Sequence, residues 1–372
     1  MNKKVEIIAF YLPQFHPFPE NDEWWGKGYT EWTTVGKAKP LFKGHNQPRV
    51  PSELGYYDLR LPIIREQQAQ MARDAGVTAF CYWHYWFGNG KRLMADVFDE
   101  VLESGKPDFP FCLGWANHSW SAKNWNADGT TTNKLLMEQT YPGHEDAKMH
   151  FSFLLKAFRD ERYLKIDGSP LFFIYDPKSL PDEYLANFKR WTVDAGFPGL
   201  YLISKEDWQI TKDDVLAKGY NAVFTEKHIQ ITKHTGSSIK DKGIRVFQIR
   251  LKKLLSLLKH RPPFMSDYKK EYHNLLDAEA CKEEIVPTVI PQWDHTPRSG
   301  WNGTLFVNAT PELFYEHAKE ALALVKEKKN PIVILKSWNE WGEGNMMEPD
   351  LTYGRGFIEA LRKAVDEYKY AK

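Results

Sequence analysis

Short apolar runs alternate with amphipathic stretches along this chain of 372 residues. The apolar runs are rich in β-branched and aromatic residues and are bounded by Gly, Pro or Asp, so they predict strands. Eight such runs occur, at Ile7–Leu12, Val77–Tyr85, Phe111–Ala116, Leu171–Tyr175, Leu200–Ser204, Ala222–Thr225, Val289–Trp293 and Ile332–Ser337. Most are apolar on both faces, which is typical of parallel strands covered by helices.

Stretches with a helical repeat of apolar residues separate these runs. They predict helices at Leu61–Ala75, Arg92–Ser104, Ala147–Asp160, Asp182–Ala195, Pro311–Lys328 and Tyr353–Tyr370. Two of them run into a glycine, Gly76 and Gly196, that can end a helix. Eight strands alternating with helices predict an α/β fold, a single (β/α)8 TIM barrel. A doubly wound open sheet is the alternative.

The segment 228–284 interrupts this regular alternation. It holds Lys- and Ser-rich pieces and the pair Pro262-Pro263. We expect it to be a long insertion after the sixth strand. Because no repeat, low-complexity tract or linker marks a second domain, the sequence predicts one catalytic domain over residues 1–372.

Charge and composition exclude several classes of partner. Fifty basic and 49 acidic residues leave a net charge of +1, which gives no general attraction to nucleic acid. No window approaches 18 consecutive apolar residues, so we expect no membrane span. The three cysteines lack a CxxC spacing, which argues against a disulfide framework and a structural zinc. If Met1 is the natural start, the lack of a signal peptide there predicts a cytoplasmic protein. The sequence gives no indication of the oligomeric state.

Aromatic residues make up 15% of the chain and include 14 Trp. They can fill a core, but they also suit stacking on the flat apolar faces of sugar rings. In a barrel the active site lies at the carboxyl ends of the strands. The candidates for substrate binding at these ends are His16, Trp83, His84, His118, Trp120, Glu226, Trp293 and Asp294.

Several of these candidates have a structural alternative. His84 and His118 fit contact with sugar hydroxyls and satisfied positions in the core equally well. Glu226 is a possible third carboxylate of the site, or an ion-pair partner of Lys205 or Lys227. The pair of Trp293 and Asp294 after the seventh strand resembles a stacking platform with an orienting acid. Glu31, in the first long loop, is a further candidate that could equally be a surface acid.

The strongest motif follows the last strand. It reads Ser337-Trp338-Asn339-Glu340-Trp341-Gly342-Glu343-Gly344-Asn345, with Glu348 just beyond. Acid–base catalysis on a sugar needs two carboxyl groups, one protonated and one ionised near neutral pH. We therefore expect Glu340 and Glu343 to be catalytic.

The remaining residues of the motif are candidates for supporting that pair. Trp338 and Trp341 could form the apolar wall that raises one pKa and could line the glycan cleft, while Asn339 and Glu348 could contact the substrate. The alternative is an ion pair of Glu340 with Lys336 and a role for Glu343 as an acid in the first turn of a helix. The position of the motif after the last strand, among many aromatic residues, favours catalysis.

The motif resembles that of a known enzyme family. Trp338–Gly344 looks like the catalytic motif of glycoside hydrolase family 99, the endo-α-mannosidases and mannanases, with Gly342 where a bulkier residue is expected. The segments Ala9–His16, Trp24-Trp25, Gly28–Trp32 and Phe80–Trp86 resemble the WbsX-type proteins, relatives of family 99 that are often labelled glycosyltransferases. The WbsX-type resemblance covers nearly the whole chain, whereas that to family 99 rests on the barrel and this motif.

The resemblance implies retaining cleavage of an α-linked, mannan-like or surface-polysaccharide glycan without a covalent glycosyl-enzyme. The residue matching the base, Glu340, would deprotonate the sugar's 2-hydroxyl, and Glu343 would protonate the leaving oxygen. The alternatives are a glycosyltransferase or transglycosylase of surface-polysaccharide assembly and a glycan-binding barrel without catalysis. We expect no cofactor and no catalytic metal, since no HExxH or comparable spacing occurs, although Asp176, Glu226, His228 and Asp294 might converge.

Overall fold

The computed structural model describes residues 3–125, 131–206, 209–233 and 260–370, together with 253, 256 and 258. The chain forms two compact units. Unit 1 comprises Met1–Pro17, Gly28–Phe80 and Phe224–Lys372, and unit 2 comprises Phe18–Lys27 and Cys81–Val223. The prediction of one functional domain stays a prediction, and residues 234–252 of the expected insertion lie outside the described residues.

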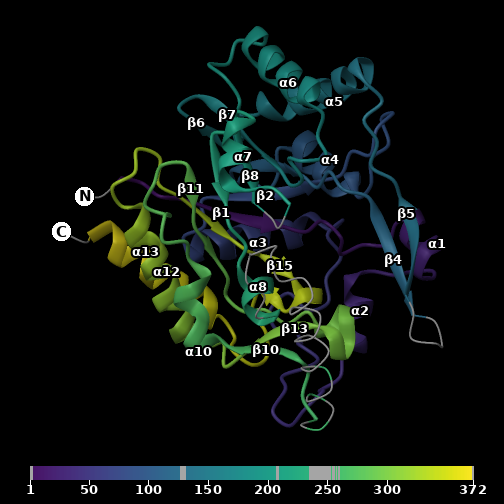
Figure 1. The fold of residues 1–372 in the computed structure, drawn as a ribbon, viewed down its shortest axis with the longest axis vertical. Helices are drawn as coiled ribbons and strands as arrows, with labels where there is room; N and C mark the ends of the chain where they lie inside the picture. Colours follow the sequence, from purple (N-terminus) through teal and green to yellow (C-terminus); the bar gives the residue numbers. More distant parts are fainter. Residues whose placement is uncertain are drawn as a thin grey trace. The chain divides into compact units, whose positions relative to one another are not determined.

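The fold is a nearly closed α/β barrel of nine parallel strands, which confirms the predicted class (Figure 1). Along the sheet the strands are β11 (Ile285–Val286), β9 (Ala222–Phe224), β8 (Tyr201–Lys205), β7 (Ser169–Ile174), β3 (Phe111–Trp115), β2 (Ala79–His84), β1 (Glu6–Tyr11), β14 (Ile332–Leu335) and β12 (Thr288–Val289). Most of these strands are buried along their whole length. This is expected for parallel strands that have helices on one face and the barrel core on the other.

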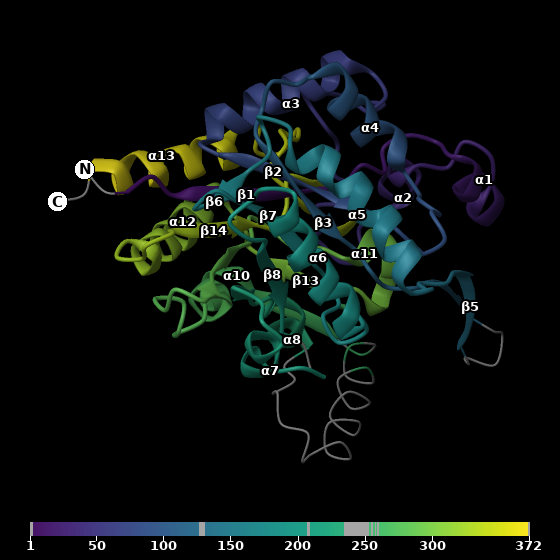
Figure 2. The ribbon, with the colours of Figure 1, turned by 90° about the horizontal axis from the view of Figure 1, so that it is seen from above.

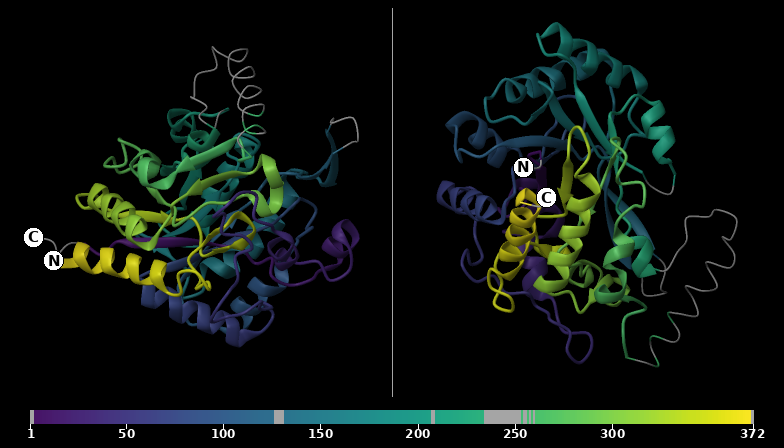
Figure 3. Two further views of the ribbon diagram at one scale, coloured as in Figure 1. Left: turned by 90° about the horizontal axis from the view of Figure 1, so that it is seen from below. Right: turned by 90° about the vertical axis from the view of Figure 1, so that its left-hand side faces the viewer.

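Unit 1 holds the first and last strands of the chain. In it β14 pairs in parallel with β1 and with β12. Its helices are α2 (Glu31–Lys37), α3 (Pro62–Ala75), α8 (His228–Lys233), α10 (Tyr268–Glu271), α11 (Thr296–Ser299), α12 (Pro311–Val325) and α13 (Gly356–Tyr370). Helices α12 and α13 lie side by side, and β1 begins at the same end of the unit at which α13 ends (Figures 2 and 3).

Local sequence explains the ends of these helices. Thr310 precedes α12, where its hydroxyl accepts a hydrogen bond from the Leu313 amide, and Pro311 occupies the first turn. Helix α3 ends as predicted at Gly76, whose φ of 87° lies in the left-handed region that suits glycine. The side chains that α12 and α13 bury follow the helical repeat, and Phe314 meets Phe357 at 5.7 Å between ring centroids.

Unit 2 contains the parallel strands β3, β7 and β8. Its helices are α1 (Pro19–Trp25), α4 (Ala95–Ser104), α5 (His144–Phe158), α6 (Asp182–Asp194) and α7 (Lys212–Ala217). The antiparallel hairpin of β4 (Trp120–Trp125) and β5 (Thr131–Met137) follows β3, and β6 (Lys165–Ile166) pairs with β7. Part of its core is aromatic, with Phe151 and Phe188 packed on Trp191.

The eight predicted strands all exist, but the seventh is misplaced. It was expected at Val289–Trp293, whereas β12 ends at Val289. Pro291 has no amide hydrogen to donate to a neighbouring strand, so the ladder cannot continue through it. Trp293 and Asp294 consequently lie in a loop four and five residues beyond the strand. The pairs β4–β5 and β10 (Phe264–Asp267) with β13 (Thr304–Val307) were not predicted.

Candidate active site

The motif after the last barrel strand folds into a small hairpin in unit 1. Strand β15 (Asn339–Glu340) pairs antiparallel with β16 (Asn345–Met346), and the 3-10 turn η4 (Trp341–Glu343) joins them. Gly344 follows the turn with a φ of 53°, which glycine adopts without strain. Glu340 thus precedes the turn and Glu343 ends it, with two residues between them. Both carboxyls can therefore contact the same side chain.

Asn339 fixes this hairpin to the end of β1. Its side-chain oxygen accepts a hydrogen bond from the Leu12 amide at 2.8 Å, and its amide nitrogen donates to the Leu12 carbonyl at 2.9 Å. The Trp338 amide adds a bond to the Phe10 carbonyl at 2.8 Å. Asn339 is fully buried. It therefore positions the hairpin and is not exposed to a substrate, in contrast to the sequence-based expectation.

The common partner of the two glutamates is Arg298, on α11. One terminal nitrogen of its guanidinium donates to Glu343 at 2.6 Å. The other donates to Glu340 at 3.2 Å and lies 3.1 Å from the Glu31 carboxylate. Glu31 begins α2, after Thr30 has capped that helix, and its side chain is buried. The structure thus brings three predicted acids together around a cation that the sequence analysis did not identify.

Asp294 anchors the turn that carries Arg298. One of its oxygens accepts from the amide and hydroxyl of Thr296, at 3.0 and 2.6 Å. The other accepts from His45 at 2.8 Å and from Gln47 at 2.7 Å. Burial would raise the pKa of Asp294, but the bonds from His45 and Gln47 hold it below its usual value. With both oxygens occupied, this acid positions α11 rather than orienting a sugar.

The two catalytic candidates have pKa values displaced in opposite directions. Burial, together with the neighbouring charge of Glu343, raises the pKa of Glu340 to about 8. Burial acts on Glu343 in the same direction, but Arg298 and Lys336 outweigh it and lower its pKa. In the free protein near pH 7, Glu340 therefore holds a proton and Glu343 is ionised, as an acid–base pair requires. This order is the reverse of the one that the resemblance implies.

Lys336 is the second cation beside the pair. Its ammonium lies 3.2 Å from the Glu226 carboxylate and 5.7 Å from the centre of the Trp293 ring. Lys336 is therefore an ion-pair partner of Glu226, a lysine other than the two that the sequence suggested, and its charge also acts on Glu340. This placement keeps Glu226 near the pair as a charge that compensates Lys336.

Glu348 lies behind the hairpin in a buried hydrogen-bond network. It accepts from Tyr57 at 2.8 Å, from Gln68 at 2.6 Å and from Trp341 at 2.6 Å. Burial raises its pKa to about 7 against the opposing effect of these bonds. Trp338 is 0% and Trp341 1% exposed. Both indoles are thus buried, and neither offers a face on which a sugar could stack, while their role as an apolar wall beside the pair stays a prediction.

Two further candidates in unit 1 are also buried. Trp293 is 3% exposed, donates to the Thr304 hydroxyl at 2.9 Å and contacts His228 at 4.1 Å between ring centroids. It belongs to the core and not to a stacking platform. His16 is likewise buried after the end of β1.

The other four candidates lie in unit 2. His84 is buried and bonded to His150 at 2.9 Å, and burial lowers its pKa, so it is a neutral core histidine. His118 is exposed and faces Tyr175, on which Trp83 packs edge-on at 5.7 Å. Trp120 is partly exposed beside Tyr85. Trp83, His118 and Trp120 are therefore the aromatic candidates with surface available to a ligand.

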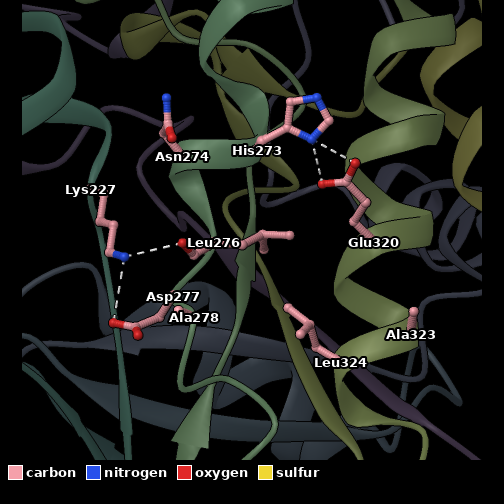
Figure 4. Close-up of a pocket in the computed structure, with 9 residues that line it drawn as sticks. All are labelled: Lys227, His273, Asn274, Leu276, Asp277, Ala278, Glu320, Ala323 and Leu324. Atoms are coloured by element: carbon pink, nitrogen blue, oxygen red, sulfur yellow. Dashed lines mark hydrogen bonds and ion pairs between the residues drawn. The ribbon is translucent and has the colours of Figure 1, made fainter.

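A shallow cavity of about 640 Å³ lies elsewhere in unit 1 (Figure 4). Lys227 reaches across it to the Leu276 carbonyl at 3.1 Å and to Asp277 at 3.5 Å, and His273 faces Glu320 at 2.7 Å. Its polar side chains are thus engaged with one another. None of the residues predicted to bind substrate lines it.

Among the described residues, no group of three or more His, Cys, Asp or Glu side chains is arranged to hold a metal ion, and Asp176, Glu226, His228 and Asp294 form no such group. Within the same part of the chain, no helix is long and apolar enough to cross a membrane.

The barrel is similar in fold to solved structures of glycoside hydrolase family 99. Two similar solved structures are endo-α-mannosidases of that family from Bacteroides thetaiotaomicron. They are 16% and 15% identical to this chain, cover 98% of it and 97% of their own chains, and give TM-scores of 0.55 and 0.56. A "glycoside hydrolase-like protein" matches with a TM-score of 0.56 at 16% identity, over 100% of this chain and 95% of its own. At these identities the likeness concerns the fold.

The chain belongs to the family described as "Glycosyltransferase WbsX", whose model matches residues 7–361. Two curated relatives are both named "Uncharacterized protein WxcX" and come from Xanthomonas campestris pv. campestris, strains B100 and ATCC 33913. Each is 31% identical over 96% of this chain and 49% of its own length. The chain thus spans about half the length of these relatives.

Proposed function

We propose that this chain is a retaining glycoside hydrolase that cleaves an α-linked, mannan-like or surface-polysaccharide glycan, with Glu340 and Glu343 as its acid–base pair. The observation that carries the proposal is the shared partner of the pair. One guanidinium, Arg298, contacts both carboxyls, at 3.2 and 2.6 Å, while their pKa values are displaced in opposite directions. One proton shared by two such groups is what glycoside cleavage uses.

The proposed steps follow those of the family that the motif resembles. The base takes the proton of the 2-hydroxyl while that oxygen bonds to C1 and the bond from C1 to the leaving oxygen breaks. The acid gives its proton to the leaving oxygen. Water then bonds to C1 while the bond from C1 to the 2-oxygen breaks; the water gives a proton back to the acid, and the 2-oxygen recovers its proton from the base. The resemblance makes Glu340 the base and Glu343 the acid.

When the pair of carboxyls shares one proton, that proton can lie on Glu340 or on Glu343. The roles that the resemblance implies need it on Glu343, which in the free protein is the less populated of the two forms. The two forms differ only in which carboxyl holds the proton, so their ratio is the same at every pH. A pH profile alone therefore does not assign the roles, and a leaving-group experiment is needed to do so.

The family name favours a second candidate, a glycosyltransferase or transglycosylase that builds surface polysaccharide. Such an enzyme with a nucleotide-sugar donor must bind a diphosphate. The cluster of Glu31, Glu340, Glu343 and Arg298 has three acids and one base, and this charge favours a neutral sugar over a diphosphate. We therefore place the transferase second.

Incubation of the protein with α-mannan and other α-linked glycans, with and without nucleotide sugars, tests the proposal. We expect oligosaccharide release without any nucleotide, and loss of that release in the Glu340→Gln/Glu343→Gln double variant. Products that form only with a nucleotide sugar would identify a transferase. Binding of glycans without any new product under either condition would identify a non-catalytic barrel.

A further inference from the structure

The contact between Arg298 and Gly342 has no counterpart in the sequence-based account of the site. We propose that Arg298 is a positioning residue of the carboxyl pair, and that position 342 is glycine because the Glu31–Arg298 ion pair occupies the space of a side chain. The inference rests on the proposed function in the experiments that measure activity, and does not depend on it in those that measure a pKa.

The first step is the charge balance of the cluster. Arg298 lies within 3.2 Å of three carboxylates, from α2, β15 and η4. Without a cation among them, these acids would repel one another, and the pKa values of Glu340 and Glu343 would rise. The guanidinium also presents its donors in a fixed planar arrangement, so it holds the Glu340 and Glu343 oxygens in one geometry.

The second step concerns the space at Gly342. A Cβ atom there would overlap the Glu31 carboxylate and lie 2.9 Å from Nε of Arg298. The φ of Gly342 is not in the left-handed region, so its backbone conformation does not itself require glycine. The three atoms that a Cβ would meet, the Glu31 carboxylate oxygen and Nε and Cζ of Arg298, all lie toward the far ends of long side chains. We therefore expect Gly342→Ala to fold and to displace the ion pair.

The third step is that Arg298 is held in place from behind. Its helix α11 is bonded through Thr296 to Asp294, which His45 and Gln47 fix in turn. The other charged or titratable groups that act on Glu343 include Lys336 and His228, from other segments, His295, which directly precedes α11, and Glu340 itself. These groups stay in place when Arg298 is replaced, so its own contribution can be measured separately.

The experiment compares Arg298→Met, Arg298→Lys, Gly342→Ala and the Arg298→Met/Gly342→Ala double variant. Arg355→Met is a matched control, since Arg355 also bridges two carboxylates, Glu53 at 2.7 Å and Asp74 at 3.2 Å. Gly36→Ala is the control for the glycine, because a Cβ there meets nothing within 4 Å. Circular dichroism and thermal melting establish that each variant is folded.

We expect kcat/KM to fall at least about tenfold in Arg298→Met and in Gly342→Ala, with partial rescue in Arg298→Lys and no change in the controls. Loss of the cation raises the pKa of both carboxyls, so the whole pH profile of kcat/KM moves to higher pH, by about one unit or more. The kcat/KM of the double variant should be no lower than that of the less active single variant, because both substitutions disrupt the same ion pair.

A substrate-independent measurement separates this proposal from the proposed function. Titration of the glutamate carboxyls by 13C NMR, assigned with Glu343→Gln, reports the pKa of Glu343 directly. We expect that pKa to rise in Arg298→Met and in Gly342→Ala, whether or not the protein cleaves glycans. An unchanged pKa, an unshifted profile in Arg298→Met, or losses that multiply in the double variant would overturn the proposal.

Discussion

Glu340 and Glu343 are the same kind of residue three positions apart, yet their surroundings displace their pKa values in opposite directions. Burial dominates at Glu340, whereas at Glu343 the charges of Arg298, 2.6 Å away, and of Lys336 together outweigh burial. At the residue scale the sequence indicated the pair, because two carboxyls beside tryptophans after the last strand are a strong local pattern. Arg298 was not identified, because an arginine four residues after Asp294 carries no local signal of its distant partners.

Glycosides that differ in their leaving group assign the roles of the pair. A dinitrophenyl α-glycoside needs no proton on its leaving oxygen, so replacing the general acid should cost it little, while replacing the base should abolish turnover. With the order that the resemblance implies, Glu343→Gln keeps the release of dinitrophenolate in the first turnover, whereas it loses about 10²–10⁴-fold on a natural glycan, and Glu340→Gln is inactive on both. The reverse pattern would make Glu340 the acid, in agreement with the free protein.

At the scale of elements, the hairpin β15–β16 depends on contacts with distant parts of the chain. Asn339 bonds both polar groups of Leu12, and Glu348 joins Tyr57, Gln68 and Trp341. The periodic helices were predictable because their buried positions repeat locally. The burial of Trp293 and the bonds of Asn339 to Leu12 were not, because side-chain direction after a strand end is set by tertiary packing.

Replacing Asn339 by Ala should destabilise the protein and the site together. The Leu12 amide and carbonyl would lose their partner while buried, at a cost of about 2–5 kcal/mol in the free energy of unfolding. Urea denaturation measures this loss, with Asn46→Ala as control, since the bond of Asn46 to Thr352 is exposed. A change in Asn339→Ala as small as that of the control would show that the clamp contributes nothing to stability.

At the scale of the whole molecule, the alternation of strands and helices was sufficient to predict the barrel. The misplacement of the seventh strand and the unpredicted pairs β4–β5 and β10–β13 have a common cause. Short strands of two to seven residues are defined by the partner with which they pair, and the partner is not visible in the local sequence. The burial of acids such as Glu348 is also a property of the folded molecule, and the raised pKa that results makes stability depend on pH.

Stability should fall as the pH rises through neutrality. Glu348 has a folded pKa of about 7, raised above its ordinary 4.5, so its contribution is complete below about pH 4.5 and is lost as the pH rises through 7. The effect corresponds to about 3 kcal/mol when complete. Denaturation at pH 5 and pH 9 should show a smaller loss for Glu348→Gln than for the unaltered protein. Equal losses in the two proteins would contradict the assignment.

Catalysis should not depend on a divalent metal. The two proton transfers assigned to Glu340 and Glu343 leave no step that needs a Lewis acid. Activity is therefore expected to persist after exhaustive dialysis against a chelator, with circular dichroism as the control for folding. If activity disappeared while the fold persisted, and returned with calcium or manganese, this mechanism would be wrong.

The bonds between Asn339 and Leu12 join residues 327 positions apart. A ribosome makes Leu12 near the start of this chain and Asn339 near its end, so the clamp cannot close while most of the chain is still being synthesised. The carboxyl pair next to the clamp is also made late, after all the other strands of the barrel. Until then the first strand lacks β14 as its neighbour and its terminal amide lacks a partner. A nascent or truncated chain that ends before Asn339 thus lacks both the clamp and the carboxyls of Glu340 and Glu343. The proposed catalytic pair and the contacts that hold its hairpin are therefore completed together, late in the synthesis of this chain.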